Sequence, residues 1–324
     1  MLETRITRML GISYPIVMGG MMFAGTAELA AAVSDAGGLG VIAAGNYPSP
    51  GELKAAIGKL RNLTDRPFGV NVTLMPSFRP LDRGALVDTA VAEGAAAIEL
   101  AGPDTVEFYG RIKAAGTARI IHKCAYARHA RAAERKGADA VAIIGYEAGG
   151  APPMDEVTTF IQVPQVADAL GIPVLAGGGI GDARGFVAAL ALGAEGVIMG
   201  TRFLACKESP VHPSIKEAIR KAGSSDTMIV KALLGIGERV LKNEMSYKVR
   251  SLEEQGAGLD ELKEYIIGER ARKSWNEGDL EDGLLAMGQV IGLISEVNSV
   301  KEVIDAIVSG AAEIGSRLFP PAPK

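Results

Sequence analysis

Two glycine-rich turns follow two consecutive apolar runs, and turns of this kind can bind an anion. Residues 172–176 read IPVLA, a short run typical of a strand buried on both faces, and three glycines follow at once. A second run, residues 196–199, ends at a Gly-Thr pair. Glycine lets backbone N–H groups approach a phosphate because no Cβ stands in the way, although such glycines also serve as plain tight turns. The predicted phosphate cradle consists of Gly178, Gly179, Gly200 and Thr201.

Composition restricts the classes of partner. The chain has 324 residues, a net charge of −4 and no basic tract, which argues against nucleic acid as a partner. Residues 1–11 lack the apolar core of a signal peptide, and no run of 18 apolar residues could cross a membrane. Cys124 and Cys206 are too few for a disulfide framework or a zinc site, so no metal is expected. We expect a cytoplasmic protein that acts on a small molecule, with a homo-oligomer as an open option.

The elements that must position these turns alternate regularly. Apolar strand-like runs are separated by helical segments, and eight such alternations in about 200 residues favour a (β/α)8 TIM barrel. A doubly wound sheet is the alternative, but it usually places its phosphate glycines after the first strand. The expected strands are residues 14–18, 39–43, 68–72, 96–100, 118–122, 139–144, 172–176 and 196–199.

The alternation stops after about residue 213. Residues 214–287 show helices with charged faces and no convincing strand, and they are too long for a loop between a strand and a helix. We therefore predict three parts. Residues 1–213 form the barrel, residues 214–287 form a helical lid or substrate domain over its active-site face, and residues 288–324 return to the barrel with a terminal helix at about residues 300–318.

Several short motifs, in order, resemble one enzyme family. They are PIVMGGM at residues 15–21, FGVN at 68–71, HK at 122–123, GYEAGG at 145–150, AGGGI at 176–180, MGTRF at 199–203 and GQ at 288–289. This pattern resembles the nitronate monooxygenase group, formerly called 2-nitropropane dioxygenase, which is related to the FMN-dependent enoyl-acyl-carrier-protein reductases. The resemblance implies an FMN-bound TIM barrel with a helical substrate domain inserted late in the chain.

The resemblance also assigns roles around FMN. It implies that the phosphate lies on the predicted cradle and that Asn71 binds the pyrimidine edge of the ring. Lys123 would stabilise negative charge on the reduced flavin near N1 and C2=O. The motifs imply further cofactor contacts from Gly19, Gly20, Met21, Glu147, Gly149 and Gln289.

One departure from the family pattern concerns proton transfer. Ala151 stands where the resemblance would place a catalytic histidine, and alanine cannot move a proton. The chain has only three histidines, at positions 122, 129 and 212. His212 follows strand eight and could approach the active-site face, whereas His122 should point away from it if its neighbour Lys123 points inward. The alternative proton carriers are Tyr146, Asp155 and Glu156.

Three functions remain open at this point. The first is an FMN-dependent, nitronate monooxygenase-like enzyme acting on an anionic nitronate. The second is an NAD(P)H-dependent reductase of an enoyl thioester, an enone or a quinone. The third is a flavin-binding protein whose activity has lapsed with the histidine. The missing base disfavours oxidation of a neutral nitroalkane, because that reaction requires removal of a proton.

Overall fold

The structure, a computed structural model, describes residues 2–74, 81–102 and 106–318. At its centre lie eight strands in the order β1-β8-β7-β6-β5-β4-β3-β2, and neighbouring strands in this order pair in parallel. Val17 and Leu39 bridge the two ends of this order, and Met18 N donates to Leu39 O at 2.9 Å. The strands therefore close into the expected (β/α)8 barrel. They are β1 Ile16–Met18, β2 Gly40–Ala43, β3 Phe68–Thr73, β4 Ala97–Ala101, β5 Arg119–Cys124, β6 Ala140–Ile144, β7 Val174–Gly177 and β8 Gly196–Met199.

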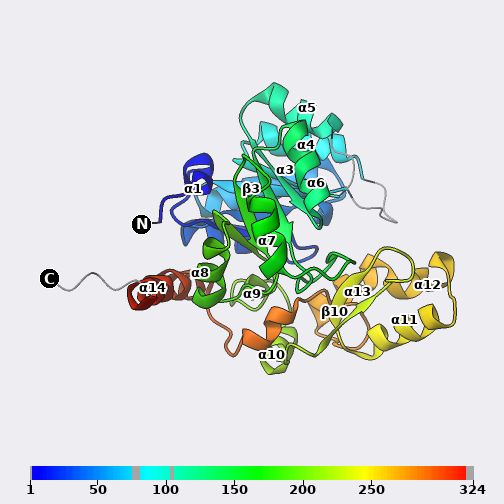
Figure 1. Ribbon diagram of the computed structural model, residues 1–324. Coiled ribbons are helices and arrows are strands. Elements are labelled where there is room, and N and C mark those ends of the chain that lie inside the picture. The colour runs from blue at the N-terminus through cyan, green and yellow to red at the C-terminus, as the bar shows by residue number, and fades with distance from the viewer. Residues whose placement is uncertain (1, 75–80, 103–105, 319–324) are drawn as a thin grey trace.

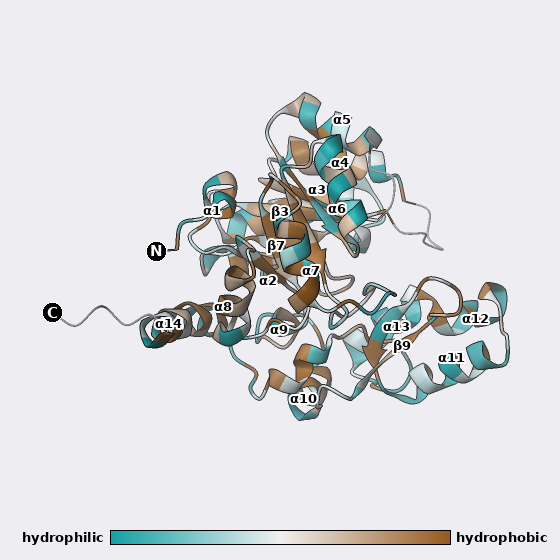
Figure 2. Cartoon of the chain, in the orientation of Figure 1, coloured by the Kyte–Doolittle hydropathy of each residue, from teal (hydrophilic) through white to brown (hydrophobic). Residues whose placement is uncertain are grey.

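The strands are buried because helices cover their outer faces. Apolar β-branched residues dominate the strands, and Figure 2 shows the hydrophobic residues gathered there, with hydrophilic ones on the surrounding helices. The long last helix, α14, packs against α8 (Figure 1) and also against α2, and it has the bounds that the sequence predicts. The covering helices are α1 Arg5–Leu10, α2 Ala27–Asp35, α3 Pro50–Leu63, α4 Arg83–Ala92, α5 Val106–Ala115, α6 Ala127–Lys136, α7 Thr159–Ala167, α8 Ala183–Ala191 and α14 Val300–Leu318.

Local capping fixes where several helices begin. The carboxylate of Asp182 accepts hydrogen bonds from the backbone N–H groups of Arg184 and Gly185, as its position before α8 predicts. Thr26 occupies the N-cap position of α2, but its side chain makes no capping hydrogen bond. That helix starts at Ala27, because residues 21–25 form a turn closed by Gly25 N donating to Met21 O.

Residues 214–287, called the appended segment below, contain strands that the sequence did not reveal. The expectation of helices without a strand is wrong, because β9 and β10 pair as an antiparallel hairpin. The strand residues 238–241 run directly into a helical pattern, and only the capping box of Asn243 with Ser246 separates the two elements. Around the segment, the elements are α10 Pro213–Lys221, β9 Thr227–Val230, β10 Glu238–Leu241, α11 Glu244–Glu254, α12 Leu259–Ile266 and α13 Gly268–Glu277.

Two small cores hold the appended segment together and to the barrel. One lies between the hairpin and α11 and α12, with Val230, Val240 and Val249 fully buried. The other joins α10 and Trp275 of α13 to the segment after β8. The short helices α9 Thr201–Leu204 and η2 Gln289–Leu293 contact each other at this junction, and η1 Ala44–Asn46 follows β2. Among the described residues, no helix is both long and apolar enough to span a bilayer.

Candidate functional site

The turns after β7 and β8 form what we call the glycine arc: Gly178, Gly179 and Gly200. Their backbone N–H groups donate no hydrogen bond to any described residue. Gly178 and Gly179 have φ values of 95° and 73°, a region that favours glycine, so the turn itself requires them. Gly200 has a φ of −110°, and a Cβ placed on it would come no closer than 3.6 Å to Met21 Sδ. The fold therefore does not demand glycine at position 200, whereas a closely approaching ligand would.

Thr201 and Glu147 support this arc from behind. The backbone N–H of Gly288 donates to Thr201 Oγ1 at 3.0 Å, which anchors the returning chain to the end of β8. The carboxylate of Glu147 accepts from Thr159 N at 2.9 Å, at the start of α7. Thr159 Oγ1 lies 2.9 Å from the carbonyl oxygen of Gly178. The structure thus gives Glu147 a role in shaping the turn, with its carboxylate directed at the end of a helix.

We call the end of the barrel at the carboxyl ends of its strands the mouth. On the side of the mouth opposite the glycine arc, polar side chains from three strands form what we call the charged arc: Asn71, Glu99 and Lys123, together with the backbone of Gly20. Lys123 Nζ lies 2.6 Å from Glu99 Oε1, and the lysine side chain is 24% exposed while the glutamate is 1% exposed. The backbone N–H of Gly20 donates to Glu99 Oε2 at 2.8 Å. A Cβ on Gly20 would lie 2.2 Å from Asn71 Cγ, so only glycine can pack there. Gly19 and Met21 flank this contact.

Glu99 is the site residue that sequence reasoning missed. It lies in β4 within the run AAAIELA, and a lone carboxylate in an otherwise apolar strand is the signal that could have identified it. Its register opposite Asn71 in β3 places both side chains on the same face of the sheet. The link from β4 to the turn after β1 shows that this face is the barrel interior.

The loop after β6 lies between the two arcs, and it carries Ala151. Gly150 and Arg239 of β10 exchange backbone hydrogen bonds of 3.1 and 2.7 Å, which tie the appended segment to this loop. The Arg239 guanidinium is buried, donates to Tyr146 O and lies 4.7 Å from the centroid of the Tyr146 ring. Ala151 itself is exposed. The β9–β10 hairpin therefore holds this loop at Gly150, while the side chain of Ala151 is exposed to solvent.

The returning chain lies against the same loop. A Cβ on Gly149 would lie 2.5 Å from the carbonyl carbon of Met287, so backbone packs directly on backbone. The N–H of Gln289 donates to Glu147 O at 2.9 Å, and its side chain is half-buried. These contacts bring the predicted residues Glu147, Gly149 and Gln289 together at one edge of the mouth.

None of the three histidines is placed as a base at Ala151. His212 caps α10, with Nδ1 accepting from Ser214 N at 3.2 Å. His122 is buried on the outer face of β5 beside Tyr109, and burial lowers the pKa of its imidazole to about 4. His129 is exposed on α6.

The remaining proton carriers lie on the loop after β6. Tyr146 Oη donates to Glu156 Oε1 at 3.1 Å, while Asp155 and Glu156 are exposed. Tyr146 is half-buried and follows β6 directly, so it is the least solvent-exposed of the three groups. Among the described residues, no set of three or more His, Cys, Asp or Glu side chains converges to hold a metal ion.

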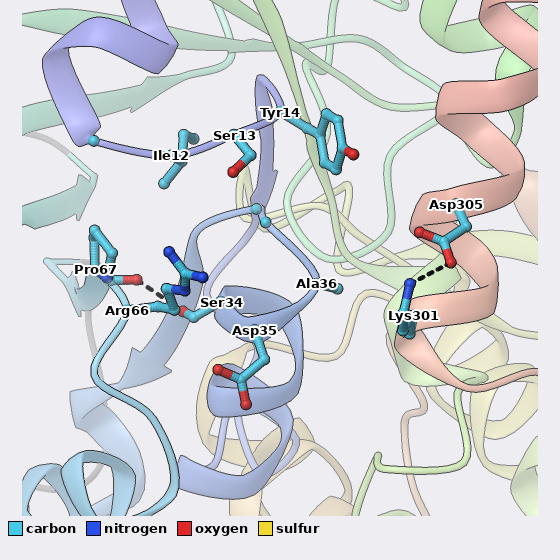
Figure 3. A pocket seen from close by; sticks show the side chains of 13 residues that line it. Ile12, Ser13, Tyr14, Ser34, Asp35, Ala36, Arg66, Pro67, Lys301 and Asp305 are labelled. Atoms are coloured by element: carbon cyan, nitrogen blue, oxygen red, sulfur yellow. Dashed lines mark hydrogen bonds and ion pairs between the residues drawn. The ribbon is translucent and has the colours of Figure 1, made fainter. Parts of the chain in front are cut away.

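A separate hollow lies at the opposite end of the barrel. It has a volume of about 210 Å³ and is lined by the turns that precede β1 and β2, by Arg66 and by the start of α14 (Figure 3). Lys301 pairs with Asp305 on its α14 side. Active sites of (β/α)8 barrels lie at the carboxyl ends of the strands, so we place the functional site at the two arcs instead.

The two arcs fit the chemistry of FMN. Unpaired backbone N–H groups suit a phosphate, and Gly200 leaves space that the chain does not use. A buried amide, a buried carboxylate and a partly exposed ammonium on the other arc suit the polar edge of a flavin ring. Within the part of the chain that the structure describes, Glu99 Oε1 has no hydrogen bond besides its ion pair with Lys123, so it retains acceptor capacity.

Comparison with known proteins agrees with this geometry. The chain is 34% identical to a (3aS,4S,5R,7aS)-5-hydroxy-7a-methyl-1-oxo-octahydro-1H-indene-4-carboxyl-CoA dehydrogenase of Mycobacterium tuberculosis, over 96% of each chain. FabK from Thermotoga maritima superposes with a TM-score of 0.91 at 41% identity, covering 98% of this chain and 99% of that one.

A third similar protein is a nitroalkane oxidase from Streptomyces ansochromogenes. It superposes with a TM-score of 0.80 at 26% identity, covering 97% of this chain and 99% of that one. The family model described as nitronate monooxygenase matches residues 3–120 and 85–310. The chain therefore belongs to the nitronate monooxygenase family of oxidoreductases.

Proposed function

We propose that this protein is an FMN-dependent oxidoreductase that uses NAD(P)H to reduce an alkene conjugated to a thioester carbonyl. The observation that carries the proposal is the loop after β6, where Ala151 is exposed and no described histidine takes the place of a base. Oxidation of a neutral nitroalkane needs such a base, whereas reduction of an activated alkene does not.

The relatives support the same substrate class. Nitronate monooxygenases and the FabK reductases are FMN-dependent flavoproteins, and FabK shares 41% of its sequence with this chain. The name of the mycobacterial relative describes a dehydrogenase of a carboxyl-CoA, which is itself a thioester. A thioester carbonyl withdraws electrons from a neighbouring double bond, which prepares that bond to accept hydride.

Each part of the mouth would contribute separately. The N–H groups of the glycine arc would hold the phosphate, and Asn71 and Lys123 would hold the polar edge of the ring. Bound FMN would supply hydride transfer between the nicotinamide and the substrate. The appended segment would act as a lid, since β10 already bonds the loop that carries Ala151. Tyr146, hydrogen-bonded to Glu156, would donate the proton to the α-carbon.

The test is anaerobic reduction of the FMN-loaded protein, followed at the flavin absorbance band. Rapid bleaching by NADH or NADPH, and recovery of the band on adding an enoyl-CoA, is the expected result. Bleaching by a nitronate alone would contradict the proposal and favour a nitronate monooxygenase. A protein that no donor bleaches would be a flavin-binding protein without this activity.

A second candidate function is oxidation of an anionic nitronate. It is favoured by the family model and by the similarity to the nitroalkane oxidase. A preformed nitronate has already lost its proton, so the absence of a histidine at Ala151 would not prevent this reaction. Turnover of a nitronate but not of its neutral nitroalkane would identify this function.

A further inference from the structure

Glu99 carries a buried negative charge that packing does not require. Its side chain is 1% exposed, and its two oxygens contact Lys123 Nζ at 2.6 Å and Gly20 N at 2.8 Å. Burying an ion pair removes both charges from water, and apolar residues of similar volume often stabilise a fold equally well. A role in positioning other groups therefore explains this carboxylate better than a role in stability.

The geometry of Glu99 extends across the barrel mouth. Glu99 is on β4 and its partner Lys123 is on the neighbouring strand β5. Gly20 follows β1, and two strands, β2 and β3, lie between β1 and β4 in the barrel. The Gly20 backbone also packs directly on the Asn71 side chain. One carboxylate thus holds both a cation and the turn after β1 in fixed positions.

The pair is oriented with its positive end toward the opening. The Lys123 side chain is 24% exposed while the Glu99 side chain is 1% exposed, so the carboxylate lies behind the ammonium. The electrostatic interaction of each charge with a ligand weakens with distance. The carboxylate is farther from the ligand, so it cancels only part of the effect of the nearer ammonium. A ligand in the mouth therefore meets a partly neutralised cation.

We propose that Glu99 is a positioning residue that sets the reduction potential of the bound flavin. It fixes the Lys123 ammonium and the Gly20 turn against the ring, and its negative charge keeps the potential below the value that Lys123 alone would produce. The inference rests on the proposed function, because it places the flavin ring on the charged arc.

The experiment measures the flavin potential of the FMN-loaded unaltered protein, two single variants, their double variant and one control by anaerobic titration against a reference dye. Glu99→Gln keeps the shape and an oxygen for the Gly20 N–H but removes the charge. The ratio of reduced to oxidised flavin at a fixed potential should rise about tenfold, or about 30 mV for a two-electron couple. Lys123→Met should lower the ratio by about the same factor. The double variant should lie between the two single variants.

Asp139→Asn provides the matched control. Asp139 Oδ1 lies 3.7 Å from Arg119, at the opposite end of β5, so this variant makes the same change in net charge far from the mouth. Its potential should equal that of the unaltered protein. A purely structural role for Glu99 would weaken FMN binding without moving the two potentials in opposite directions.

The possible outcomes separate the two proposals. If the unaltered protein binds no FMN, the proposed function fails and this inference fails with it. If FMN binds but Glu99→Gln leaves the potential unchanged or lowers it, only this inference is overturned. If Glu99→Gln does not fold, Lys123→Met is compared with the double variant, in which both charges are absent. A higher potential in the double variant supports the inference, and equal potentials overturn it.

Discussion

The glycine arc and the charged arc share one barrel mouth but are built from different atoms. The glycine arc offers backbone N–H groups and empty space, and its shape depends on the φ values of Gly178 and Gly179, which only glycine adopts easily. The charged arc offers side chains whose positions depend on one another through Glu99. A backbone site tolerates changes in its surroundings, whereas a network of buried charges fails as a unit when one member is removed.

The largest expected effect comes from adding a titratable group between the arcs. Ala151→His should introduce a base beside the mouth, and turnover of a neutral nitroalkane should then rise by roughly 100- to 10,000-fold. Steady-state rates with a nitroalkane across neutral pH would measure this. Ala151→Gln is the control, since it adds similar bulk without a base. Equal rates of nitroalkane turnover in both variants, or strong nitroalkane activity of the unaltered protein, would contradict the prediction that position 151 is the place of the base.

The next effect distinguishes the two faces of β5, where Lys123 faces inward and His122 faces outward. Burial lowers the pKa of His122 to about 4, so between pH 6.5 and 4 the unfolded chain binds more protons than the folded one. Protonation of His122 therefore costs no stability above about pH 6.5, and the free energy of unfolding falls by about 3 kcal/mol as the pH falls to about 4.

Chemical denaturation across this pH range would measure the loss. His122→Gln should remove this part of the pH dependence, whereas His129→Gln, at an exposed position on α6, should leave most of it. The prediction fails if the unaltered protein and His122→Gln lose stability in parallel as the pH falls.

A smaller effect concerns the clamp on the loop between the arcs. Arg239→Met removes the guanidinium that donates to Tyr146 O. Hydrogen exchange of the backbone amides at positions 150 and 239 should then become about tenfold faster. Arg272→Met, at an exposed position on α13, serves as the control and should leave both rates unchanged. Unchanged exchange in Arg239→Met would show that the backbone bridge holds the loop without help from the side chain.

The sequence predicted the barrel because its strands are continuous apolar runs with turns between them, and it predicted the glycine arc because glycine turns follow two consecutive strands of this kind. It did not predict the β9–β10 hairpin, since residues 238–241 join a helical pattern with only Lys242 and the helix cap Asn243 between them. Glu99 was missed because its contacts with Gly20 and Lys123 depend on strand register. Contacts of this kind follow from barrel closure, which no local pattern encodes.

The most direct test of the site compares FMN with riboflavin, which lacks the phosphate, by calorimetric titration of the flavin-free protein and of Gly200→Val. The unaltered protein should bind one FMN per chain and bind riboflavin more weakly. Because the fold leaves room at position 200, the variant should lose roughly 10- to 100-fold in FMN affinity and little in riboflavin affinity. Equal affinity of the unaltered protein for both flavins, or equal losses in the variant, would contradict the phosphate cradle.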